Sequence, residues 1–195
     1  MNKGRLEAFS DGVIAILITI MVLELRTPEG ATVEALASRM PLLLIYVLSF
    51  VFVGIYWNNH HHLLQATERI NGRILWANLQ LLFWLSLTPF AMAWMGEFPR
   101  AALPTAAYGV VLLCAGIAYL MLQHEIVAAQ GPQSKLGTIL GRDFKGNISA
   151  VLYLLAVVFA FVSPWISKAI YVFVALMWLV PDSRIERSGL GEKQH

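Results

Sequence analysis

Long stretches without a charged side chain are the feature that most constrains this sequence. No Asp, Glu, Lys or Arg occurs in four stretches of 28, 23, 24 and 22 residues, at 40–67, 74–96, 101–124 and 146–167. A helix needs about 20 mostly apolar residues to cross the hydrocarbon core of a bilayer. Charged residues make up 13% of the chain, against roughly 25% in soluble domains. We therefore expect a membrane protein that crosses the bilayer several times, and not a soluble globule.

The apolar segments predict an all-α membrane protein in which residues 1–195 form a single domain of six transmembrane helices. Pro164 is expected to begin the sixth helix, because the first helical position needs no N–H donor. Thr88-Pro89 is expected to kink the third helix, and the segment 124–146, which contains several glycines, is expected to be a connector. The expected helices cover residues 6–25, 41–62, 74–95, 104–123, 146–163 and 165–181.

Lys and Arg residues flank the expected helices unevenly, with ten on one side of the membrane and four on the other. Cytoplasmic loops are enriched in Lys and Arg, so we expect both termini in the cytoplasm and the protein in the plasma (inner) membrane. The ten are Lys3, Arg5, Arg69, Arg73, Lys135, Arg142, Lys145, Arg184, Arg187 and Lys193, and the four are Arg26, Arg39, Arg100 and Lys168.

Composition and motifs argue against several other classes of protein. The formal net charge is only +2 and no run of Lys and Arg occurs, so nucleic-acid binding is not expected. The single cysteine, Cys114, rules out a disulfide within the chain. Serine hydrolase, P-loop and zinc protease motifs are missing from the sequence, so we expect neither an enzyme nor a bound cofactor.

The start of the first expected helix is unusual, because it places Arg5, Glu7 and Asp11 at the membrane boundary. Charge there is costly unless it is paired or hydrated, so Asp11 is interpreted as a structural anchor or as a functional group. Partners for it are expected where the second helix ends and the third begins, at the same membrane depth. Indole, imidazole and amide groups can hydrogen-bond a carboxylate. The candidate partners are Trp57, His60, His61 and Asn78.

A helical wheel at about 100° per residue divides the first helix into two faces. Asp11 and Ser10 lie about 140° and 120° from Ile16, so they point into the helix bundle if Ile16 faces away from it. The stripe around Ile16 either lines an axis shared between copies or is ordinary helix packing. Thr19 in this stripe either faces that axis or returns a hydrogen bond to the carbonyl of Ala15. The stripe consists of Ile16, Thr19, Ile20 and Leu23.

Three consecutive histidines, His60, His61 and His62, end the second expected helix. Consecutive side chains on a helix diverge by about 100°, so the three cannot converge on one metal ion. Structural hydrogen bonding is therefore the favoured interpretation, with pH sensing and metal binding as the alternatives. No metal site is expected.

Three motifs in the sequence are distinctive together. Arg5, followed after three residues by Phe9-Ser10-Asp11, lies at the head of the first expected helix, YWNNHHH lies at 56–62 and NLQLLFWLSLTPF at 78–90. In these motifs the chain resembles the transmembrane protein 175 family of potassium channels. The resemblance covers most of the chain and is strongest in the first 90 residues. Six helices in about 200 residues is also the size of the family's repeat.

The resemblance implies that four copies of the chain assemble in the bilayer as a homotetramer, with potassium ions passing through a central pore lined by the first helices. The family's constriction positions fall on Ile16 and Leu23. Thr19, together with Ile20 of the same stripe, is expected to line the ion path and set selectivity. A structural hydrogen-bond network is expected to hold the helix in place. Its members are Arg5, Phe9, Ser10, Asp11, Trp57, His60, His61 and Asn78.

The sequence lacks TVGYG, the carbonyl filter of ordinary potassium channels. We therefore expect a leak-type channel of modest selectivity, in which rings of Ile16 and Leu23 dehydrate ions and close by dewetting. Two other functions stay open. One is a small proton-coupled secondary transporter that uses Asp11 and a membrane-proximal histidine. The other is a membrane-embedded structural protein without transport.

Overall fold

The computed structural model describes residues 3–67, 69–130 and 144–179, and helices make up nearly all of them. The helices are α1 (Lys3–Leu23), α2 (Val33–Gln65), α3 (Gly72–Ser86), α4 (Thr88–Glu97), α5 (Ala102–Gln130), α7 (Phe144–Phe159) and α8 (Pro164–Leu179). The expectation that 124–146 is a connector is wrong in part, because α5 continues to Gln130. The connector residues 131–143 lie outside the described residues.

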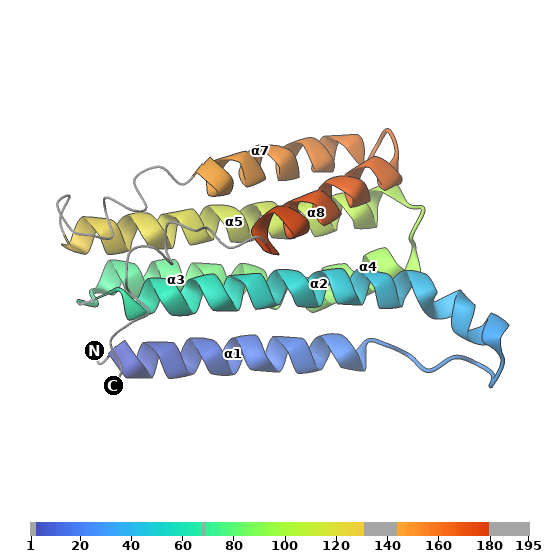
Figure 1. The fold of residues 1–195 in the computed structure, drawn as a ribbon, viewed down its shortest axis with the longest axis horizontal. Helices are drawn as coiled ribbons and strands as arrows, with labels where there is room; N and C mark the ends of the chain where they lie inside the picture. The colour runs from blue at the N-terminus through green and yellow to red at the C-terminus, as the bar shows by residue number, and fades with distance from the viewer. Residues whose placement is uncertain (1–2, 68, 131–143, 180–195) are drawn as a thin grey trace.

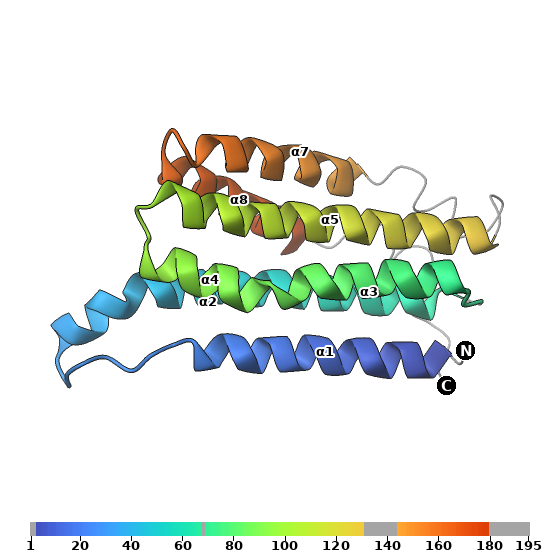
Figure 2. The same ribbon diagram turned by 180° about the vertical axis from the view of Figure 1, so that it is seen from behind.

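Four of the helical segments are long and apolar enough to cross a membrane. They are α1, α2, α5 and the segment Gly72–Glu97, in which α3 and α4 follow each other (Figure 2). The helices α7 and α8 are apolar but have only 16 residues each. These lengths fit a protein that passes through the membrane several times.

Local signals explain where several helices begin and end. The second helix starts at Val33, well before the expected 41, because the Thr32 side chain accepts a 3.2 Å hydrogen bond from the backbone N–H of Ala35 and caps it. Pro41 lies inside this helix. The expected kink at Thr88-Pro89 is an interruption at Leu87 between α3 and α4, because proline cannot donate the backbone hydrogen bond that continues a helix.

The helices form layers, with α1 along one side of the bundle (Figure 1). It packs against α2, α3 and α4, and α5, α7 and α8 lie beyond these (Figure 1). The first residue of α1 and the ends of α2 and α5 meet at one end of the bundle. There Lys3 Nζ donates to the Gln65 carbonyl over 2.7 Å, and Gln130 Nε2 donates to the Ala66 carbonyl over 3.1 Å.

Several polar side chains inside the bundle are hydrogen-bonded to one another or to the backbone. The hydroxyl of Tyr108 lies 2.9 Å from Ser49 Oγ, and Tyr171 donates to the Thr105 carbonyl over 2.9 Å. Tyr171 reaches this position because Gly109 has no side chain; a Cβ there would collide with the Tyr171 hydroxyl. The packing of α5 against α8 therefore depends on a glycine.

A candidate pore-lining helix and its anchor

The two faces of α1 differ sharply in exposure. The side chains that pack on α2, α3 and α4 are buried: Leu6, Ser10, Ile14, Leu17 and Met21. On the opposite face Ile16 is 57% exposed and Leu23 is 79% exposed. No other helix of the described chain covers this face, which lies on the outer side of the bundle (Figures 1 and 2).

The exposed stripe on α1 is longer than the four residues expected from the sequence. At about 100° per residue, Arg5, Phe9 and Gly12 also fall within about 40° of Ile16, and all three are exposed. The helical period of the sequence contains this signal for Arg5 and Phe9, whose expected place in the network came instead from the family resemblance. The complete stripe is Arg5, Phe9, Gly12, Ile16, Thr19, Ile20 and Leu23, all exposed.

Thr19 is the one hydroxyl in this stripe. Its Oγ1 donates a 2.8 Å hydrogen bond to the carbonyl of Ile16, so the expected alternative partner, Ala15, is wrong. A hydroxyl has one hydrogen and two lone pairs. Because the hydrogen is used within the helix, the lone pairs of Oγ1 remain as acceptors on the exposed face.

Asp11 lies on the side of α1 that faces α2. The indole Nε1 of Trp57 donates a 3.0 Å hydrogen bond to Asp11 Oδ1. The Trp57 ring stacks on His61, with ring centroids 5.8 Å apart and 20° between the planes. Gln65 Nε2 in turn donates to His61 Nε2 over 2.8 Å. We call this set Asp11, Trp57, His61 and Gln65 the indole anchor.

Ser10 starts a second chain of contacts, deeper in the bundle. Asn78 Nδ2 donates to Ser10 Oγ over 3.0 Å, and His60 Nε2 lies 2.6 Å from Asn78 Oδ1. The amide oxygen can only accept, so His60 donates from Nε2. Ser10 Oγ in turn donates a 2.9 Å hydrogen bond to the carbonyl oxygen of Leu6. All three side chains of this amide anchor (Ser10, Asn78 and His60) are buried.

The structure therefore brings together six of the eight residues expected in the network. Arg5 and Phe9 lie apart from it on the exposed stripe. Phe9 is 53% exposed, and among the described residues Arg5 has no hydrogen bond or ion pair. Gln65 was not expected; its position four residues after His61, one helical turn away, was the available signal.

The three consecutive histidines point to different surroundings. His60 is buried against Asn78, His61 stacks on Trp57, and His62 is exposed. Within the ranges 3–67, 69–130 and 144–179, no three His, Cys, Asp or Glu side chains are grouped so that they could hold a metal ion.

The segment that carries the stripe and both anchors matches a known family. A family model described as endosomal/lysosomal potassium channel TMEM175 matches residues 5–89. A potassium channel of Chryseobacterium sp. (strain P1-3) is 52% identical over 188 residues, which cover 96% of this chain and 98% of that relative. The chain belongs to the TMEM175 family.

Two further TMEM175 proteins show how far the similarity extends. The crystal structure of a homologue of the lysosomal potassium-selective channel TMEM175, from Chamaesiphon minutus, superposes with a TM-score of 0.80 at 28% identity and covers 91% of this chain and 96% of that one. The endosomal/lysosomal proton channel TMEM175 of Danio rerio is 28% identical over 135 residues, which cover 67% of this chain but 25% of the fish protein. Membership in the TMEM175 family identifies this chain as a multi-pass membrane protein of a channel family and gives no support to an enzymatic function.

Proposed function

We propose that this protein is a potassium-permeable, leak-type cation channel formed by four copies of the chain, with α1 lining the pore. The observation that carries the proposal is the uncovered stripe on α1, whose central residues are apolar, together with the two anchors on the opposite face of the same helix. Two similar proteins support the choice of ion, because one is named a potassium channel and the other a homologue of a potassium-selective channel.

Several copies are needed because one protomer cannot enclose a pore with a single outward-facing helix. A ring of copies around one axis turns the four stripes toward each other. One flank of the stripe carries small side chains, and small residues allow helices in membranes to approach closely. These exposed residues are Gly4, Ala8, Gly12 and Ala15.

Ile16 and Leu23 are proposed as the constriction. They are seven residues apart, so their two rings would lie about 10 Å apart along the axis. Narrow apolar rings force an ion to lose part of its hydration, and they close by dewetting. Ile20 lies between the rings on the same stripe and narrows the path further.

Thr19 is proposed as the ion contact between these rings. Four copies of its Oγ1, each with its hydrogen held by the Ile16 carbonyl, would present lone pairs to a partly dehydrated cation. Hydroxyl oxygens attract a cation less strongly than a full cage of carbonyls, so the expected preference for potassium over sodium is modest.

The direction of insertion follows from the basic residues. Arg69 and Arg73 flank the link between α2 and α3, at the end of the bundle where α1 begins with Lys3 and Arg5. Since Lys and Arg are enriched on the cytoplasmic side, we place this end in the cytoplasm, in the plasma (inner) membrane.

The proposal is tested by single-channel recording from the purified full chain in planar bilayers with opposed potassium and sodium gradients. The expected result is a cation current that reverses nearer the potassium equilibrium potential. Ile16→Asn and Leu23→Asn should each raise the conductance, because an amide hydrates the apolar ring. The matched control is Ile117→Asn, which places the same amide on an exposed position of α5. A current that is equal in all four proteins would exclude Ile16 and Leu23 from the pore.

Proton transport is the second candidate. It is favoured by the name of the Danio rerio relative, a proton channel, and by the contact of both Asp11 and His61 with Trp57. The same recordings separate the two functions: a pH gradient in symmetrical potassium drives a current only if protons permeate. A current that follows the proton gradient and ignores potassium would replace the first proposal.

A further inference from the structure

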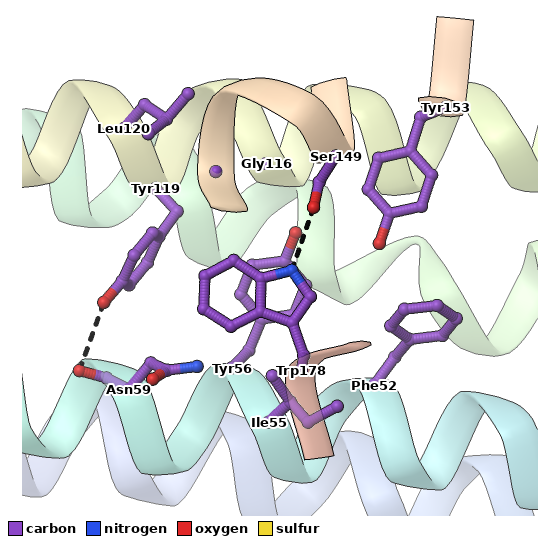
Figure 3. Close-up of a pocket in the computed structure, with 11 residues that line it drawn as sticks. Phe52, Ile55, Tyr56, Asn59, Gly116, Tyr119, Leu120, Ser149, Tyr153 and Trp178 are labelled. Carbon is purple, nitrogen blue, oxygen red and sulfur yellow. Dashed lines mark hydrogen bonds between the residues drawn. The ribbon is translucent and has the colours of Figure 1, made fainter. Parts of the chain in front are cut away.

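A small cavity lies on the far side of α2 from the exposed face of α1. It is lined by residues of α2, α5, α7 and α8, where α7 begins and α8 ends (Figure 3). Its volume is about 40 Å³, and five of its eleven lining residues are aromatic: Phe52, Tyr56, Tyr119, Tyr153 and Trp178.

Two of the polar groups around the cavity already have partners. Trp178 Nε1 donates to Ser149 Oγ over 2.9 Å, and Tyr119 donates to the Asn59 carbonyl over 3.3 Å (Figure 3). Among the residues that the structure describes, none with a charged side chain lines the cavity. A charged ligand would therefore lose its hydration without a counter-charge in return.

Tyr153 is the group that stands out. Its side chain is only 3% exposed, its ring points toward the cavity (Figure 3), and within the described part of the chain its hydroxyl has no hydrogen-bond partner. The hydroxyl of Tyr56, which also lines the cavity, has none there either. Tyr56 is half-buried, and neither hydroxyl is completely shielded by protein atoms. Each can therefore pair with a ligand that carries a hydroxyl or another neutral polar group.

The size of the space narrows the class of ligand. One water needs roughly 10–15 Å³ of such volume, so the cavity holds about three waters or an organic molecule of about four non-hydrogen atoms. Waters need two to four polar partners each, and the wall is mostly apolar. An apolar tail with a single hydroxyl fits this wall better than a water cluster.

We propose that the cavity is a binding site for a small neutral amphiphile of the short-chain alcohol class. Its hydroxyl pairs with Tyr153 and Tyr56, and its carbon tail lies against the rings of Phe52 and Trp178. The site depends on Gly116: a Cβ at this position would lie 3.7 Å from the Tyr56 hydroxyl and 4.0 Å from a Tyr153 ring carbon. One methyl group is therefore tolerated there, whereas a larger side chain fills the site.

The test uses the full chain purified in detergent and 2-bromoethanol, an alcohol of four non-hydrogen atoms whose bromine quenches tryptophan fluorescence on contact. The expected result is a saturable quenching component that 1-propanol displaces and that dialysis reverses. Protonated 2-aminoethanol, of the same size but charged, should not displace it. Quenching that grows linearly with the 2-bromoethanol concentration would overturn the proposal. Equal displacement by 1-propanol and by protonated 2-aminoethanol would overturn it as well.

Variants then locate the site. Trp178→Phe should remove the saturable component by removing the reporter, and Gly116→Leu should remove it by filling the cavity, while Gly116→Ala should keep it. Tyr153→Phe should weaken binding about fivefold, the loss expected for one hydrogen bond. Equal affinity in Tyr153→Phe and the unchanged protein would show that the hydroxyl does not hold the ligand, and would overturn the assigned ligand class.

Discussion

Trp57 donates a hydrogen bond from its indole Nε1 to the Oδ1 of Asp11, across 3.0 Å and 46 positions of sequence. This bond joins α1 to α2 on the face of α1 that does not carry the exposed stripe. An acid near the membrane boundary is costly unless a partner holds it. Asp11 therefore helps to fix the rotation of α1 about its own axis, although it lies outside the exposed stripe. This rotation determines the direction in which Ile16 points.

Loss of the indole anchor is expected to reduce folding and assembly, and not ion discrimination. Asp11→Ala and Trp57→Phe each break the bond, and Trp57→Phe also leaves the carboxylate without its donor; a hydrogen bond typically contributes about 0.5–1.5 kcal/mol. Thermal unfolding and size-exclusion chromatography of the purified protein measure both effects. Trp76→Phe, at a largely exposed tryptophan of α3, is the control. An Asp11→Ala protein that assembles normally but loses its preference for potassium would contradict this assignment.

Asn78→Leu is expected to lower stability more than its small change in size suggests. The substitution leaves two buried groups, Ser10 Oγ and His60 Nε2, each without one hydrogen bond. Ser10 Oγ keeps its bond to the Leu6 carbonyl, whereas His60 Nε2 is left unpaired, which costs about 1–3 kcal/mol, so the melting temperature should fall clearly. The exposed neighbour Gln80 supplies the control, Gln80→Leu, for which little change is expected. Equal melting temperatures for the two variants would mean that the amide anchor contributes nothing.

Thr19→Ala is expected to reduce the preference for potassium over sodium, and Thr19→Ser to keep most of it, because serine retains the hydroxyl. Reversal potentials under bi-ionic conditions measure the permeability ratio. Ser86 on α3 is a close structural match: it is exposed and donates to the carbonyl three residues earlier, Phe83, over 2.7 Å. Ser86→Ala should leave the ratio unchanged. A Thr19→Ala channel with an unaltered ratio would remove Thr19 from the ion path.

Two glycine-to-alanine changes are expected to have opposite effects on stability. In Gly109→Ala the new Cβ collides with the Tyr171 hydroxyl, and overpacking of this kind typically costs about 1–3 kcal/mol. In Gly54→Ala the Cβ meets nothing within 4 Å, so the higher helix propensity of alanine should stabilise α2 by up to about 1 kcal/mol. Thermal unfolding of both variants checks the pair, and destabilisation of equal size in both would show that the contact with Tyr171 is unimportant.

Much of this fold could be predicted because membrane helices have a simple signal. The four charge-free stretches, together with the apolar segments 6–25 and 165–181, indicated where the helices lie. The period of α1 indicated that Ile16 and Asp11 lie on different faces. The ends of the helices were harder. The start of α2 at Val33 depends on the cap by Thr32, and an apolar-length criterion does not detect a polar cap.

The choice among possible partners could not be predicted in the same way. Several polar residues at the end of α2 can reach a carboxylate, and only the rotation of α2 against α1 selects Trp57 over Asn58. The sequence also could not predict that the Tyr153 hydroxyl has no partner among the described residues, because this depends on how four helices pack together.

For the proposed assembly of several copies, the small residues on the flank of α1 have a consequence. Lipid tails cover Ile16 and Leu23 about as well as another protein does, so the hydrophobic effect gives little drive toward association within the bilayer. The gain must come instead from close backbone approach at Gly4, Ala8 and Gly12. Recognition between copies would then depend on shape complementarity. A single added methyl group would weaken it, whereas a change in the hydrophobicity of the surface would have little effect.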